Sequence, residues 1–196
     1  MKLEALALDG AYRIGWSANH DHRGAFGRLS CADTLAQAGL ENLWPQTNLS
    51  RSSERGTLRG MHYQTAPCAE IKLLTCLAGR IHDVLVDLRP GSPQFGQWIA
   101  LELDGAAAEG VYIPAGIAHG FQTLTPDVML HYSHSHPYSP AHQAGVAFDD
   151  PDLAITWPLV PVAVSARDRT LPRLRDLAEF HENNRVPVGA DEEMSR

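Results

Sequence analysis

Short runs of apolar and β-branched residues recur along the chain, and turns rich in Gly and Pro separate them. Residues 81–88 alternate apolar and polar side chains in part, as a half-buried strand does, and the turn Arg89–Pro93 follows. Strands are also predicted at 97–103, 111–114, 120–124 and 128–133. Short strands with turn signals every 8–12 residues indicate an antiparallel all-β sandwich or barrel.

Helical periodicity is scarce. Residues 32–40 place Ala32, Leu35 and Leu40 roughly on one face, with Gly39 near the end, and residues 171–180 are a second candidate. We predict one domain over residues 1–182, because no linker divides that stretch. Residues 183–196 are polar, contain Pro187 and Gly189, and are predicted to form a flexible tail.

Composition narrows the class of protein. The chain has 196 residues, 44% hydrophobic and 20% charged, and a net charge of −7, which argues against a basic surface for nucleic acid or membranes. No stretch approaches the roughly 20 apolar residues of a membrane helix, and the first residues lack the apolar run of a signal peptide. Three cysteines without a CxxC pair indicate reduced thiols and a cytoplasmic protein.

The segment 55–64 is the first candidate for chemistry. At strand spacing, His62 shares a face with Gly60 and Gln64, whereas Arg59 points to the opposite face. Gly60 is predicted to leave room beside His62 for a ligand. The alternative interpretation is an edge strand that carries an incidental His.

Two further segments carry polar groups in a suggestive setting. In 112–121, Pro114 and Gly116 form a tight turn before His119, which then enters a strand. The pair Arg167-Asp168 follows a Pro-rich stretch, where a solvated loop is the simpler interpretation if it is taken alone.

The histidines at 131, 134 and 136, with His142 nearby and an HxH pair at 20–22, resemble a metal site only superficially. At strand spacing, His134 and His136 share a face while His131 points away, and no carboxylate stands close beside them in the sequence. We therefore do not assign a metal site.

Several motifs together resemble the dTDP-4-dehydrorhamnose 3,5-epimerase family. The segments, in order, are RGTLRGMHYQ, IKLLTCLAGRIHDVLVDLRPGSPQFGQW, YIPAGIAHGFQTL, and YSP followed by FDDPDLAITWPL. The resemblance extends from about Arg23 to Asp168. It implies a cupin-type jelly roll, a homodimer, no cofactor and no metal, and a nucleoside-diphosphate 4-keto-6-deoxyhexose as substrate. Metal cupins carry an HxH pair on one strand, and here Gln64 stands where the second His would be.

The resemblance also assigns the catalytic roles. His62 resembles the general base and Asp168 its carboxylate partner. Tyr132 resembles the acid on the opposite face of the sugar, and Lys72 the cation near the C4 oxygen. The reaction needs such groups, because a proton beside a ketone must be removed, the enolate stabilised, and a proton returned from the other side.

Substrate-binding positions follow from the same resemblance. The residues assigned to the sugar, diphosphate or nucleotide are Arg23, Phe26, Gln46, Asn48, Arg59, His119, Tyr138, Gln143 and Arg167. Three positions depart from the family pattern: Arg28 and Gln143 stand where many members have Glu, and Ser133 where Lys is common. These departures leave the nucleotide undecided, and also whether C3, C5 or both are inverted. A mono-epimerase, a non-catalytic sugar-binding cupin and a metal-dependent cupin enzyme are the alternatives.

Overall fold

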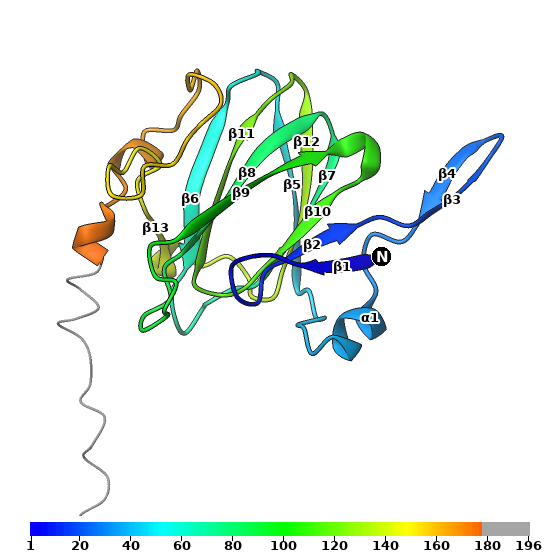
Figure 1. The fold of residues 1–196 in the computed structure, drawn as a ribbon, viewed down its shortest axis with the longest axis horizontal. Helices are drawn as coiled ribbons and strands as arrows, with labels where there is room; N and C mark the ends of the chain where they lie inside the picture. Colours follow the sequence, from blue (N-terminus) through cyan, green and yellow to red (C-terminus); the bar gives the residue numbers. More distant parts are fainter. Residues whose placement is uncertain (178–196) are drawn as a thin grey trace, which may run out of the picture.

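The computed structural model describes residues 1–177 as two β-sheets packed face to face (Figure 1). In the first sheet the strand order is β1 (Lys2–Ala5), β2 (Tyr12–Gly15), β10 (Gly110–Ile113), β7 (Lys72–Ala78), β12 (Val128–His134) and β5 (Gln46–Ser52). In the second it is β13 (Gln143–Gly145), β6 (Leu58–Gln64), β11 (Ile117–Thr123), β8 (Arg80–Asp87) and β9 (Trp98–Asp104). All strand pairs in both sheets are antiparallel, which confirms the predicted all-β architecture.

The five strands predicted from the pattern correspond to β8, β9, β10, β11 and β12. The largest difference is at β11, which begins at Ile117 rather than at residue 120. His119 therefore lies within a strand, paired with β6 on one side and β8 on the other, and its position is fixed by two ladders of hydrogen bonds.

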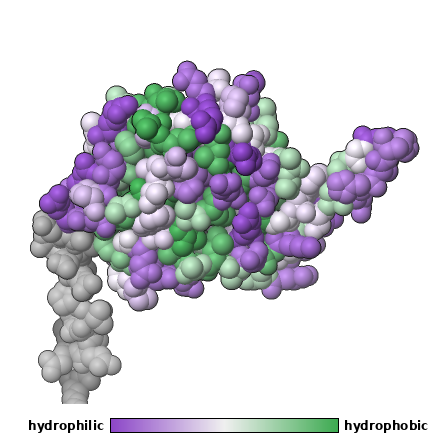
Figure 2. All heavy atoms as spheres, turned by 45° about the horizontal axis from the view of Figure 1, so that its top comes forward, coloured by the Kyte–Doolittle hydropathy of each residue, from purple (hydrophilic) through white to green (hydrophobic). Residues whose placement is uncertain are grey.

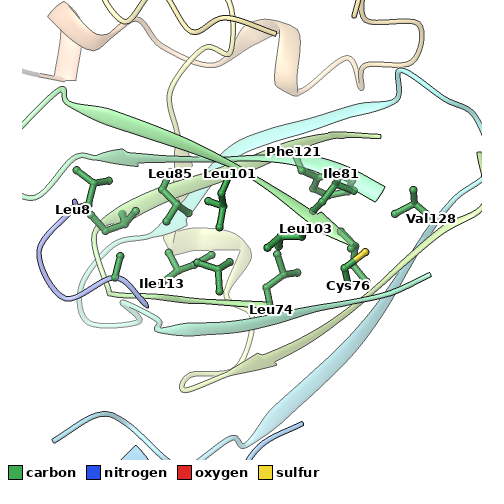
Figure 3. Close-up of a cluster of buried hydrophobic side chains, with 14 residues drawn as sticks. Leu8, Leu74, Cys76, Ile81, Leu85, Leu101, Leu103, Ile113, Phe121 and Val128 are labelled. Atoms are coloured by element: carbon green, nitrogen blue, oxygen red, sulfur yellow. The ribbon is translucent and has the colours of Figure 1, made fainter. Parts of the chain in front are cut away.

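The main hydrophobic core fills the space between the sheets (Figure 3). Leu74 and Leu130 project into it from the first sheet, and Ile81 and Leu85 from the second, all fully buried. Burying a side chain of this size stabilises the fold by about 1.5–3 kcal/mol. Beside this core, the inner-facing positions of β6, β7, β11 and β12 become polar, and there the sheets enclose a cavity.

The chain after β13 returns across the outer face of the second sheet. Leu153, Trp157 and Leu174 pack there against Met61 and other apolar side chains of β6 and β8. This packing brings the 3₁₀ turn Asp168–Thr170 next to β6. The outer layer therefore positions a carboxylate that lies 106 residues from its partner in the sequence.

Helix α1 (Ala32–Gln37) covers the outer face of the first sheet with the fully buried Leu35. It is shorter than the predicted 32–40, and Gly39 beyond it has φ +70°, the left-handed conformation that ends helices. Residues 174–177 are helical, as predicted for 171–180, and the rest of that prediction and the predicted tail lie outside the described residues. Two more 3₁₀ turns, Gly105–Ala107 and Pro140–His142, complete the elements. Within residues 1–177, no helix is both long and apolar enough to cross a bilayer.

A two-stranded hairpin, β3 (Ala18–Asp21) and β4 (Gly24–Gly27), projects away from the sandwich (Figure 1). Its surface is mostly polar (Figure 2). Phe26 is the exception, since 82% of this residue is exposed.

Candidate active site

A cavity of about 950 Å³ opens between the two sheets, and side chains from both sheets and from the segment 162–169 line it. This volume is at the upper end of the range for small-molecule sites. Eleven of the thirteen residues assigned from the sequence line this one cavity: His62, Asp168, Tyr132, Lys72, Arg59, His119, Gln46, Asn48, Tyr138, Gln143 and Arg167.

His62 and Asp168 form a hydrogen-bonded pair in the wall built by the second sheet. The Nε2 atom of His62 lies 2.8 Å from Oδ1 of Asp168. The Gly60 amide donates to the other carboxylate oxygen at 3.3 Å, and the Asp168 amide donates to Ser165 Oγ at 3.0 Å. Burial opposes ionisation of Asp168, but the hydrogen bond and charge of His62 outweigh it and lower the pKa of the carboxyl. Asp168 is thus a fixed anion that engages Nε2 of His62, and Nδ1 is the ring nitrogen that this pair leaves free of the carboxylate.

The predicted facing of β6 was wrong at Arg59. In the ladder, His62 is opposite His119, and Arg59 is opposite Phe121, so three steps on β6 match two on β11. This β-bulge shifts the alternation and puts Arg59 on the same side as His62, where both line the cavity. Simple strand alternation cannot show an inserted residue, and therefore placed Arg59 on the far face.

The predicted role of Gly60 was also wrong. A Cβ at this position would stand 2.4 Å from Cα of Gly120 and 2.9 Å from the carbonyl oxygen of His119. The space at Gly60 is therefore occupied by the backbone of β11 and is not left for a ligand. With φ of +127°, the residue also adopts a conformation that side chains disfavour.

The facing wall, from the first sheet, presents Tyr132 and Lys72. Burial raises the pKa of the Tyr132 hydroxyl well above its usual range, and the charge of Asp83 adds to this, so the phenol keeps its proton at neutral pH. Lys72 is buried beside Glu70, with Nζ 3.2 Å from Oε1, and donates to the His62 carbonyl oxygen at 3.0 Å. Burial lowers the pKa of Lys72, while the Glu70 carboxylate opposes that change.

A second His–carboxylate pair stands beside the first. The Nε2 atom of His119 lies 2.7 Å from Oδ1 of Asp83, and both residues are buried. The motif analysis found His119 but missed Asp83. A signal was available, because Asp83 lies between Ile81 and Leu85 at alternate positions of β8, and a carboxylate on the apolar face of a strand needs a partner.

Hydrogen bonds connect the polar side chains at the mouth of the cavity. Gln143 Oε1 accepts hydrogen bonds from the Tyr138 hydroxyl and from Nη1 of Arg167. The Tyr138 amide donates to Gln46 Oε1 at 2.9 Å, and Gln46 Nε2 donates to Asn48 Oδ1 at 3.3 Å. Five of the assigned binding residues therefore form one connected rim.

Arg23 and Phe26 lie elsewhere, on the projecting hairpin. Arg23 pairs with Asp21 at 2.6 Å within the hairpin itself, and neither Arg23 nor Phe26 lines the cavity of this chain. Within the single chain, the structure therefore does not bring these two residues together with the other eleven.

The histidine cluster differs from its sequence interpretation in one respect. Glu70 does stand beside it, with Oε2 2.9 Å from Nδ1 of His134. In residues 1–177, no group of three or more His, Cys, Asp or Glu side chains is arranged to hold a metal ion. The side-chain amide of Gln64 links two loops, because it donates to the carbonyl oxygens of Cys68 and Pro137.

Comparison with known proteins identifies the family. The sequence model of the family described as dTDP-4-dehydrorhamnose 3,5-epimerase matches residues 5–176. A dTDP-4-dehydrorhamnose 3-epimerase from Streptomyces niveus is 39% identical over 170 residues, which cover 86% of this chain and 82% of the relative.

Solved structures are similar over almost the whole fold. A 4-keto-6-deoxy sugar epimerase from the novobiocin gene cluster of Streptomyces spheroides superposes with a TM-score of 0.87 and 37% identity, over 92% of this chain and 90% of that one. A dTDP-6-deoxy-D-glucose-3,5-epimerase from Legionella pneumophila, in complex with dTDP-4-keto-L-rhamnose, gives 0.83 and 35%, over 89% and 93%.

The fold and the cavity therefore define a cupin-type jelly-roll isomerase. More particularly, the chain belongs to the dTDP-4-dehydrorhamnose 3,5-epimerase family, as the sequence motifs had indicated.

Proposed function

We propose that this protein epimerises a dTDP-4-keto-6-deoxyhexose at C3 and C5, in the biosynthesis of a deoxysugar. The observation that carries the proposal is the placement of His62 and Tyr132 on facing sheets of one cavity. Inversion at a carbon requires a base on one side of the ring and an acid on the other. Two sheets that enclose the sugar provide those two sides.

His62 is the base in this proposal. Its Nε2 is engaged by Asp168, so Nδ1 takes the proton from the carbon next to the ketone. The carboxylate fixes the ring orientation and stabilises the imidazolium that forms. Such general base catalysis contributes about 10²–10⁴-fold to a rate.

Lys72 stabilises the enolate and Tyr132 completes the inversion. The Lys72 ammonium is a buried donor, and a preorganised donor at a developing oxyanion contributes roughly 3–4 kcal/mol. The Tyr132 hydroxyl keeps its proton in the resting enzyme and delivers it to the face opposite His62.

The remaining polar groups bind the substrate. Arg59 supplies a permanent cation suited to the diphosphate, and the bulge in β6 directs it into the cavity with His62. Asp83 orients His119 beside them for a contact with the sugar or the diphosphate. At the rim, Tyr138 offers a half-exposed ring on which a base can stack, while Gln143 and Arg167 border it.

The active form in this proposal is a homodimer. Each hairpin reaches from its own sandwich and places Arg23 and Phe26 at the partner's cavity. Two features support this arrangement: Phe26 is exposed in the single chain, and β5, which borders the cavity, has one free edge for pairing.

The protein in this proposal is cytoplasmic. Cys31, Cys68 and Cys76 are free thiols, as is usual in that reducing compartment.

The test is incubation with dTDP-4-keto-6-deoxy-D-glucose in D₂O, followed by NMR. The proposal predicts deuterium at both C3 and C5 and a product with both centres inverted. Exchange at C3 alone would identify a mono-epimerase, the activity named for the Streptomyces niveus relative. Absence of any exchange would contradict an epimerase and favour a sugar-binding cupin.

A further inference from the structure

Lys72 belongs to a group of four side chains, which we call the Glu70 cluster: the buried Gln64, Glu70 and Lys72, and the partly buried His134. The register of β7 and β12 sets Lys72 directly opposite His134. Glu70 bridges them, with one carboxylate oxygen 3.2 Å from Lys72 Nζ and the other 2.9 Å from His134 Nδ1. Gln64 donates to the second oxygen at 3.2 Å. No family motif in the sequence points to Glu70 or His134.

The contacts of the Glu70 cluster determine which hydrogen-bond donor of Lys72 is available to a substrate. Two of the three Lys72 donors are engaged, by Glu70 and by the His62 carbonyl oxygen. No third hydrogen-bond partner of Lys72 Nζ is found within residues 1–177, so one donor is left for the substrate. Since Lys72 and Glu70 are each more than 90% buried, the ammonium has one close carboxylate to balance its charge in a site shielded from water.

We propose that Glu70 is a positioning residue of the epimerase, which keeps Lys72 charged and aims its free donor at the substrate oxygen, while His134 and Gln64 hold Glu70 in place. This inference rests on the proposed function, because it assigns Lys72 to the enolate. His134 has a second contact, since its ring stacks on that of Tyr132 with centroids 5.8 Å apart. Glu70 therefore connects Lys72, through His134, to the ring of Tyr132.

A dependence on pH follows, and its direction can be worked out. Lys72 acts in its charged form, so activity is lost as pH rises through its pKa. Burial lowers that pKa, and Glu70 is the main group that raises it again, so removal of Glu70 must move the alkaline loss to lower pH. The groups facing Lys72 from neighbouring elements are Asp83 from β8, Tyr132 and His134 from β12, the His62 carbonyl from β6 and the apolar Ile113 from β10.

The sequence makes a direct measurement possible, because Lys2 and Lys72 are its only lysines. Protein labelled with ¹³C-lysine gives two Cε signals, and Lys2 serves as an internal reference. In Glu70→Gln, we expect Lys72 to titrate at least about one pH unit lower than in wild type, a tenfold change in proton affinity. We expect the alkaline limb of the pH profile of kcat to move to lower pH together with the Lys72 titration, and KM to change less than kcat. Glu109→Gln, which breaks an ion pair with Arg13 outside the cavity, leaves Lys72 unchanged.

An unchanged Lys72 midpoint in Glu70→Gln, or an unmoved alkaline limb of kcat, would overturn the inference. If that variant does not fold, as judged by circular dichroism, Glu70→Asp replaces it. The shorter side chain holds its carboxylate farther from Nζ, so Lys72 must still titrate below the wild-type midpoint. A Lys72 midpoint equal to that of wild type in Glu70→Asp would likewise overturn the inference. Wild-type protein that lacks epimerase activity contradicts the proposed function instead, and the lysine titration remains a separate result.

Discussion

At the scale of single residues, three buried carboxylates organise the site. Asp168 engages His62, Asp83 engages His119, and Glu70 engages Lys72. Each carboxylate contacts a side chain that lines the cavity. The family motifs pointed to His62, His119 and Lys72, and to Asp168 as well, whereas Asp83 and Glu70 were identified as partners only in the structure.

Replacement of Asp168 tests the first of these pairs. In Asp168→Asn, the amide keeps the shape of the side chain but removes the anion that stabilises the imidazolium of His62. We expect kcat to fall by about 10²–10⁴-fold, the range of general base catalysis, with a smaller change in KM. Steady-state kinetics gives both values. A variant with wild-type kcat would mean that His62 does not depend on this carboxylate.

The same residue predicts how stability varies with pH. The folded-state pKa of Asp168 lies below 3.8, its ordinary value, because His62 stabilises the anion despite burial. A depressed carboxyl pKa stabilises the fold above the unfolded value and ceases to do so as pH falls through the folded value. Urea unfolding at pH 6, 5, 4 and 3 therefore shows the stability advantage of wild type over Asp168→Asn shrinking toward acid. A constant difference across this series would speak against the lowered pKa.

At the scale of elements, the bulge in β6 decides which side chains share the cavity. It turns Arg59 toward His62, and it depends on the close approach of β6 and β11 at Gly60. Alternation correctly predicted the strands and the face of His62, because burial of one side of a sheet repeats every two residues. It failed at Arg59, because a bulge is set by the partner strand and leaves no mark in the period.

Gly60→Ala measures how tightly these strands are packed. The added Cβ meets backbone atoms at 2.4 and 2.9 Å, which no side-chain rotation relieves. Gly24→Ala is the matched control, since Gly24 has φ +131° against +127° but no atom within 4 Å. We expect Gly60→Ala to lower the free energy of unfolding by about 1–3 kcal/mol more than the control does, as in overpacked cores. Equal losses in thermal or urea unfolding would show that backbone conformation alone matters there.

At the scale of the whole molecule, the sandwich provides the cavity, and the hairpin that projects from it is the contact surface of the proposed dimer. The sequence predicted the class of fold and grouped eleven residues that do meet in one cavity. It also grouped Arg23 and Phe26 with them, and the single chain holds these two apart on the hairpin. Motifs group residues by their place in the sequence pattern, and they do not record whether all of them meet within one copy of the chain.

Light scattering tests the proposed assembly. We expect a mass of twice the 21.4 kDa chain at micromolar concentration. Phe26→Ala removes an exposed ring, so it leaves the fold unchanged but raises KM by about tenfold or more, which corresponds to about 1.4 kcal/mol of lost binding. Val160→Ala removes another exposed side chain, outside the cavity lining, and is expected to leave KM unchanged. A stable monomer with full activity would exclude the hairpin from the partner's site.

The central claim is that His62 and Tyr132 act from opposite sides of one sugar, and deuterium exchange tests it most directly. Wild type, His62→Ala and Tyr132→Phe are each incubated with dTDP-4-keto-6-deoxy-D-glucose in D₂O, and NMR reports deuterium and configuration at C3 and C5. We predict exchange with inversion in wild type, and a rate lowered by at least about 10²-fold in His62→Ala, because no enolate forms without the base. In Tyr132→Phe, deuterium still enters, with retained configuration, because the protonated His62 exchanges its proton with D₂O and returns a deuteron to the face from which the proton came. Exchange at the wild-type rate in His62→Ala would contradict the account.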